Sequence, residues 1–207
     1  MRLDNSEHFS HPWRIQEITK DFELEDVWRL PVQGNADEFP ELLEVMASLD
    51  PARSDSTATK ALWVIRDLLG KWFGLGRTSA EAQPKVRVAL PIPGTAETSL
   101  IERLPEDLED TVDDPRFEVS GPFEPLFFTD DEFAAEISNQ TVHGVLHLAW
   151  VDQGDGSFVG EMAVYVKPRG RLGQGYMELI KPFRHWIVYP AMMRQIETAW
   201  VQSRASI

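Results

Sequence analysis

Two histidines and one acidic residue are the first side chains here that could carry chemistry. His143 and His147 stand four apart in TVHGVLHLAWV, and Glu161 lies in the next apolar segment, SFVGEMAVYVKP. The glycines of DQGDG between these segments predict an antiparallel hairpin. On a strand four residues span roughly 13 Å, whereas zinc needs each nitrogen at about 2 Å. We therefore expect that these two histidines share no metal ion. We also expect no other metal site and no cofactor.

The hairpin also predicts a partner for His147. Pairing Trp150 with Phe158 places Glu161 directly opposite His147, an arrangement that can orient an imidazole as a general base. The alternative interpretation is a charged pair on a half-exposed face of the sheet. The opposite face is wholly apolar, and its large side chains are Leu146, Leu148, Trp150, Met162 and Val164.

A second group of polar side chains lies among aromatics near the C-terminus, in YMELIKPFRHWIVYP. On a helical wheel an apolar face holds Tyr176, Phe183 and Trp186, and another face holds Lys181, Arg184 and His185. Pro182 and Pro190 predict kinks, because proline lacks the N–H that a helix needs. The polar trio has two interpretations: the rim of a bent core helix, or polar anchors at the mouth of a pocket.

The elements that must position these residues follow from periodicity and turn residues. We expect an edge strand in 21–32, helices over 36–49 and 56–76, short strands at 124–129 and 132–138, the hairpin, and a helix from about 176 to 204. Residues 1–20 are expected as a loosely ordered lead-in. Residues 77–122 are expected as a long connection with an acidic loop. A chain of 207 residues suits a single domain, 1–207.

Composition narrows the class of protein. The net charge of −14 disfavours nucleic acid and anionic membrane surfaces, because binding to either depends on Lys and Arg. No apolar run is long enough to span a membrane, and the first residues are not typical of a signal peptide. Cysteine is absent, which excludes disulfides and thiolate chemistry. We therefore expect a cytoplasmic protein.

Several segments also carry a resemblance. EISNQTVHGVLHLAWV, MAVYVKPRGRLGQGYMELIKPFRHWIVYP and RQIETAW resemble an uncharacterised bacterial family, domain-of-unknown-function family 2867, within the START-like helix-grip (SRPBCC) superfamily. The resemblance implies an α+β fold in which an antiparallel sheet curls around a long C-terminal helix, with a cavity between them. The superfamily includes lipid carriers, hormone receptors and polyketide cyclases. Its cavity residues vary widely, so the resemblance implies no catalytic set.

Three functions remain open. The first is binding of a small apolar or amphipathic molecule between the sheet and the C-terminal helix. Its candidate residues are Leu146, Leu148, Trp150, Met162, Val164, Tyr176, Lys181, Phe183, Arg184, His185 and Trp186. The second is an enzyme of the cyclase or hydrolase sort, with His147, Glu161 and His143 as acid–base groups. The third is an interaction module with a filled interior. A cavity above about 300 Å³ would favour the first.

Overall fold

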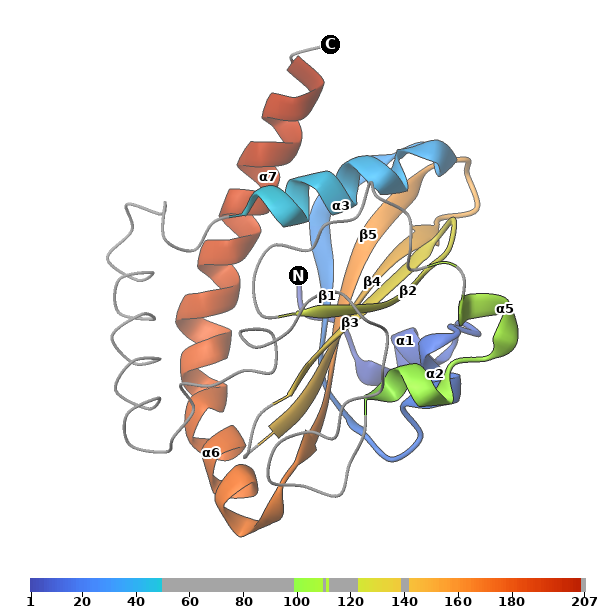
Figure 1. Ribbon diagram of the computed structural model, residues 1–207. Helices are drawn as coiled ribbons and strands as arrows, with labels where there is room; N and C mark the ends of the chain where they lie inside the picture. Colours follow the sequence, from blue (N-terminus) through green and yellow to red (C-terminus); the bar gives the residue numbers. More distant parts are fainter. Residues whose placement is uncertain (50–98, 110, 112–122, 139–141, 206–207) are drawn as a thin grey trace.

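The computed structural model describes residues 1–49, 99–109, 111, 123–138 and 142–205. An antiparallel five-stranded sheet forms its centre, with strand order β1-β5-β4-β3-β2 (Figure 1). The strands are β1 (Glu23–Gly34), β2 (Glu124–Phe128), β3 (Glu132–Ser138), β4 (Val142–Asp152) and β5 (Phe158–Pro168). The chain is therefore α+β, as expected. β1 lies at an edge, where Pro31 is tolerated because one side of an edge strand forms no ladder.

The predicted hairpin is confirmed, with a register that differs by two residues. β4 and β5 are antiparallel, and Gly154 and Gly156 adopt φ of 79° and 85° in the connection. These left-handed angles favour glycine. Trp150 pairs with Gly160, not with Phe158. Because side chains alternate with period two, a shift of two residues keeps both faces as predicted but changes every cross-strand partner.

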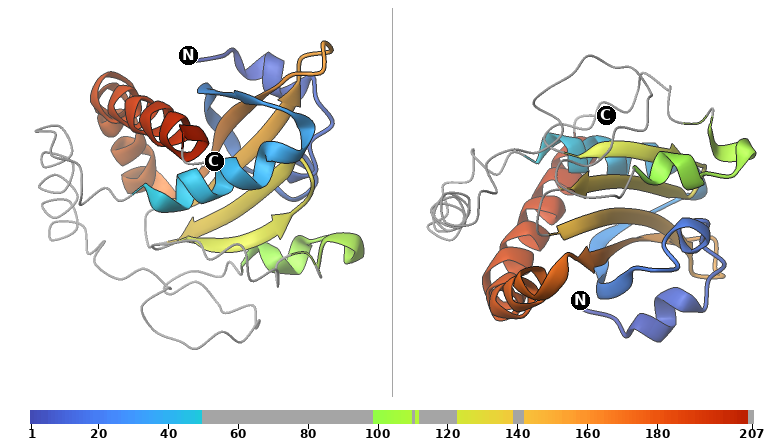
Figure 2. Two further views of the ribbon diagram at one scale, coloured as in Figure 1. Left: turned by 90° about the horizontal axis from the view of Figure 1, so that it is seen from above. Right: turned by 60° about the horizontal axis from the view of Figure 1, so that its bottom comes forward.

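One face of the sheet packs against α3 (Phe39–Ser48) and α7 (Tyr189–Ala205). Pro40 stands at the start of α3, where a missing N–H costs nothing. The buried apolar layer joins side chains of the sheet to Phe39 of α3 and to Ile196 and Trp200 of α7. Figure 2 shows α3 and α7 from two further directions. This layer confirms that the apolar hairpin face is covered by helices.

The other face is covered by segments that we did not expect to be ordered. α1 (Asn5–Phe9) and α2 (Ile15–Ile18) lie there, where a loose lead-in was expected. Trp13, Ile15 and Ile18 are buried against the sheet. Part of the expected acidic connection joins them, as η3 (Leu100–Arg103) and α5 (Glu106–Glu109). In Figure 1, α1, α2 and α5 lie on the side of the sheet away from α7.

The C-terminal helix is longer than predicted and is interrupted. α6 (Gly170–Phe183) begins six residues before Tyr176, and a π-helical turn, η5 (Arg184–Val188), joins it to α7. Pro182 stands just before this turn, where its missing N–H interrupts the regular ladder. The helix expected over 56–76 lies outside the described residues. In the described part of the chain, no helix combines the length and the apolar character needed to cross a bilayer.

Candidate functional site

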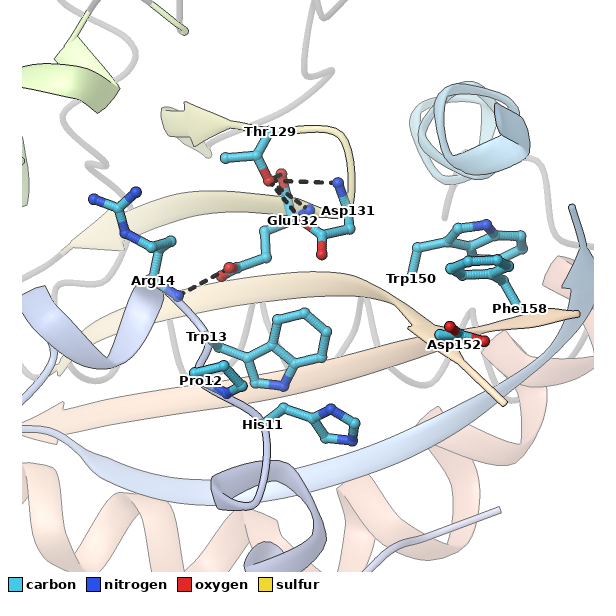
Figure 3. A pocket seen from close by; sticks show the side chains of 10 residues that line it. All are labelled: His11, Pro12, Trp13, Arg14, Thr129, Asp131, Glu132, Trp150, Asp152 and Phe158. Carbon is cyan, nitrogen blue, oxygen red and sulfur yellow. Dashed lines mark hydrogen bonds between the residues drawn. The ribbon is translucent and has the colours of Figure 1, made fainter. Parts of the chain in front are cut away.

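A pocket of about 480 Å³ opens between the N-terminal segment and one end of the sheet. Its residues come from the link between α1 and α2, from the turn between β2 and β3, and from the adjoining ends of β4 and β5. They are His11, Pro12, Trp13, Arg14, Thr129, Asp131, Glu132, Trp150, Asp152 and Phe158 (Figure 3). The volume lies within the range of small-molecule sites. The pocket is not the expected one between the sheet and the C-terminal helix.

The turn between β2 and β3 is held by its own hydroxyl. Thr129 Oγ1 accepts from the backbone N of Glu132 at 2.9 Å and donates to Asp131 Oδ1 at 3.1 Å. The backbone N of Trp150 donates to the carbonyl of Asp131 at 2.8 Å. Such side-chain-to-backbone bonds are typical of tight polar turns. They position two neighbouring carboxylates, Asp131 and Glu132, on the pocket wall.

Aromatic rings form two sides of the pocket. The imidazole of His11 stacks on the indole of Trp13 with ring centroids 5.0 Å apart, and Trp150 stacks with Phe158 at 6.5 Å. In Figure 3 Trp150 and Phe158 lie apart from Trp13 and His11, and Glu132 lies above Trp13 with its carboxylate toward Arg14. Trp13 is 7% exposed, and its buried indole N–H has no acceptor among the described residues. A buried N–H without a partner is rare in proteins.

The charges around the pocket are unequally compensated. The guanidinium of Arg14 binds both carboxylate oxygens of Asp107, at 2.8 and 3.1 Å, and Glu17 at 2.6 Å. These hydrogen bonds to Asp107 and then Glu17 raise the pKa of Arg14. Asp131 and Asp152 have no cationic partner among the described residues. The lining therefore carries unpaired negative charge.

Glu132 belongs to the pocket wall and to a buried pair behind it. Its carboxylate accepts from the backbone N–H groups of Arg14 at 2.9 Å and Ile15 at 3.3 Å. His147 Nε2 lies 3.0 Å from the same carboxylate. Desolvation lowers the pKa of the fully buried His147, more than the hydrogen bond to Glu132 raises it. Glu132 thus fixes the start of α2 onto the sheet.

Two further histidines make equivalent pairs on this face. His8 Nδ1 lies 2.5 Å from Glu161 Oε1, and its Nε2 lies 2.7 Å from the hydroxyl of Tyr165. Burial raises the pKa of Tyr165. His143 Nε2 lies 2.8 Å from Glu136. All three histidines are at most 2% exposed.

The predicted pairing of His147 with Glu161 is wrong in detail. Ala149 stands opposite Glu161, and Ala163 stands opposite His147. The expectation of a half-exposed face also fails, because His147 and Glu161 are 0% and 4% exposed. The N-terminal segment covers both residues and supplies His8 as the partner of Glu161. The hairpin sequence could not predict this burial, because the segment that covers the two residues is distant along the chain.

The polar trio of the C-terminal helix binds carboxylates of β1. A register shift between Leu24 and Asp26 interrupts the pairing of β1 with β5 beside Glu25. Asp26 is fully buried and binds Arg184 at 2.8 Å and His185 at 2.5 Å. Lys181 lies 3.3 Å from Glu25. These contacts attach the π-helical turn to the edge of the sheet.

The remaining predicted ligand residues take two positions. Leu148, Trp150 and Met162 are buried in the apolar layer under α3 and α7, with Leu146 and Val164 partly buried beside them. Trp186 is 80% exposed, so it does not face that layer. The side chains of Tyr176 and Phe183 lie outside the described residues. Trp150 alone among the predicted residues also lines the pocket.

Sequence reasoning missed most of the pocket residues. His11, Trp13, Asp131 and Asp152 are spread over more than a hundred positions and follow no spacing rule. The available signal was local: HPWR combines a histidine with an aromatic residue, and TDDE is an acidic turn between two apolar segments. Neither pattern is specific without the contact that brings them together.

Comparisons with known proteins place the chain in a family. No curated protein matches it. No solved structure matches it. The family match covers residues 18–191, which include Glu132, His147 and Glu161 but leave His8 and Trp13 outside. Because the match spans most of the 207 residues, the chain belongs to the family described as "Protein of unknown function (DUF2867)".

Proposed function

We propose that this protein binds a small amphipathic molecule, and that the ligand occupies the pocket beside Trp13. The observation that carries the proposal is a volume of about 480 Å³ between two aromatic pairs, with carboxylates on the wall. Sites that combine aromatic walls with a few polar groups are typical of small-molecule binding.

The proposal moves the ligand away from the expected position between sheet and C-terminal helix. The polar anchors proposed for that position, Lys181, Arg184 and His185, already bind Glu25 and Asp26. A ligand there would have to displace ion pairs, one of them with a fully buried carboxylate. The pocket beside Trp13 requires no such displacement, because Asp131 and Asp152 have no cationic partner among the described residues.

Native mass spectrometry of gently purified protein tests the proposal. We expect an adduct on the wild-type protein that is lost in Asp152→Tyr, because Asp152 is exposed and lines the pocket, so the larger ring fills the entrance. Asp155→Tyr is the matched control, because Asp155 is also exposed, in the hairpin loop, but does not line the pocket. An adduct that Asp152→Tyr retains would contradict the location, and a wild-type protein without adducts or added-ligand binding would contradict the function.

We also propose that the fold is of the helix-grip type. The support is the order of the sheet, in which the last strand pairs with the first and a long helical segment follows it. A cytoplasmic location is a further proposal, supported by the absence of cysteine. An experimental structure with the ligand bound tests the fold, and fractionation of cells tests the location.

A further inference from the structure

We infer that the ligand of the pocket beside Trp13 is an organic cation: an amine or quaternary ammonium group joined to an apolar group. The inference rests on the proposed function and names the chemical class that the pocket selects. It follows from three properties of the lining, namely unpaired carboxylates, aromatic faces, and an arginine whose charge is already compensated.

The carboxylates are the first property. Asp131 accepts a hydrogen bond from Thr129 Oγ1, and Asp152 Oδ1 accepts from the backbone N of Gly154 at 2.7 Å. These neutral donors leave the negative charges of Asp131 and Asp152 without a cationic partner among the described residues. A pocket that holds two such charges attracts a positive group and repels a negative one.

The aromatic rings are the second property. Trp13 and Phe158 line the same space as the carboxylates. A cation is attracted to the face of an aromatic ring, most strongly to tryptophan. An ammonium group carries the positive charge that both an aromatic face and a carboxylate attract. The remaining apolar surface accommodates the rest of the ligand.

The state of Arg14 is the third property, and it argues against an anionic ligand. His11 and Arg14 are the basic side chains of the lining. The guanidinium of Arg14 is bound by Asp107 and Glu17, so an anion would have to compete with two carboxylates. The net charge of −14 on the whole chain further disfavours an anion.

The test compares three probes of similar size by isothermal titration calorimetry. Benzyltrimethylammonium is the cation, benzyl alcohol the neutral probe and phenylacetate the anion. We expect the cation to bind about tenfold or more tightly than either of the others, and its affinity to fall as salt is added. Equal or tighter binding of benzyl alcohol or phenylacetate would overturn the inference, and so would no binding of the cation.

Isosteric variants locate the binding. In Asp131→Asn and Asp152→Asn the amide oxygen keeps the hydrogen bonds from Thr129 and Gly154, so the fold is retained while the charge is removed. We expect the double variant to lose about tenfold in affinity for the cation. Asp155→Asn, in the hairpin loop outside the pocket, is the matched control and should bind as wild type does. Unchanged affinity in the double variant would overturn the inference.

The two proposals fail differently. If the neutral probe binds as well as the cation and Asp152→Tyr abolishes both, the pocket binds small molecules but does not select cations. If a native adduct disappears in Asp152→Tyr while no cation binds, the cation class is wrong and the proposed function stands. If neither adduct nor any probe is found, both proposals are wrong.

Discussion

The two faces of the sheet are built from alternate residues of the same strands, yet they are stabilised differently. The face under α3 and α7 is an apolar layer of large side chains, including Trp150 and Met162. The face under α1, α2 and η3 contains three buried histidine–glutamate pairs among apolar residues. Apolar packing tolerates many partners, whereas a buried carboxylate needs one donor in one position. The second face therefore specifies where the N-terminal segment must lie.

The largest effect is expected on the apolar face. Trp150→Ala should lower the free energy of unfolding by about 4 kcal/mol, because it removes a large buried ring and leaves a cavity. Trp186→Ala is the matched control and should change stability by less than about 0.5 kcal/mol, since Trp186 is 80% exposed. Urea unfolding of both variants measures the difference. Similar losses in the two would contradict the assignment of the apolar layer.

The polar face should be nearly as sensitive to loss of one partner. His8→Leu is expected to cost about 3 kcal/mol, because it leaves the buried carboxylate of Glu161 without its hydrogen-bond partner. Replacing both partners, in His8→Leu with Glu161→Met, should recover part of that loss, since no buried charge then remains. Chemical denaturation of the two variants measures the recovery. A double variant less stable than His8→Leu would contradict this expectation, because removing the buried charge would then not offset the loss of the pair.

Two ion pairs between the C-terminal helix and strand β1 should affect stability less than the two faces do. Arg184→Ala should cost about 2 kcal/mol, because Arg184 binds the fully buried Asp26. Lys181→Ala should cost less than about 0.5 kcal/mol, because Lys181 is 38% exposed and pairs with Glu25 near the surface. Thermal denaturation of the two variants compares them. Equal losses of stability in the two variants would contradict the prediction that the more buried ion pair contributes more.

The smallest effect is a dependence of stability on pH that belongs to the polar face. Burial lowers the pKa of His147 below its ordinary value of 6.5, so the unfolded chain binds a proton more readily than the folded protein. The resulting stability is present above pH 6.5 and is lost as the pH falls further, by at most about 1.4 kcal/mol per pH unit.

Urea unfolding at pH 7.5 and pH 5.5 tests this dependence. In His147→Gln the side-chain amide can still donate to Glu132 but cannot take up a proton, so the loss between the two pH values should be smaller than in the wild-type protein. An identical loss in both proteins would contradict the assignment.

Much of the fold could be predicted because it depends on local patterns. Alternation along β4 and β5 predicted both faces correctly even though the register differs by two residues. The short strands β2 and β3 and the first-turn position of Pro40 were likewise predicted. The N-terminal segment was not, because residues 1–20 have little periodicity and are ordered by contacts with the sheet.

The candidate site was much less predictable. Grouping of Lys181, Arg184 and His185 was visible in the sequence, but their partners Glu25 and Asp26 stand about 160 residues away. The pocket draws on three separate parts of the chain, and of its lining residues the sequence predicted only Trp150 as a ligand contact. No spacing rule connects such residues, because their proximity depends on how whole elements pack.

The sequence by itself determined which residues alternate, where the hairpin turns, and that the C-terminal helix is interrupted near Pro182, because these properties depend on neighbours and on backbone chemistry. The tertiary structure alone decided which acid meets which histidine, that the N-terminal segment covers them, and where a pocket opens. The physical reason is that burying a carboxylate requires a specific donor, and that donor can come from any distance along the chain.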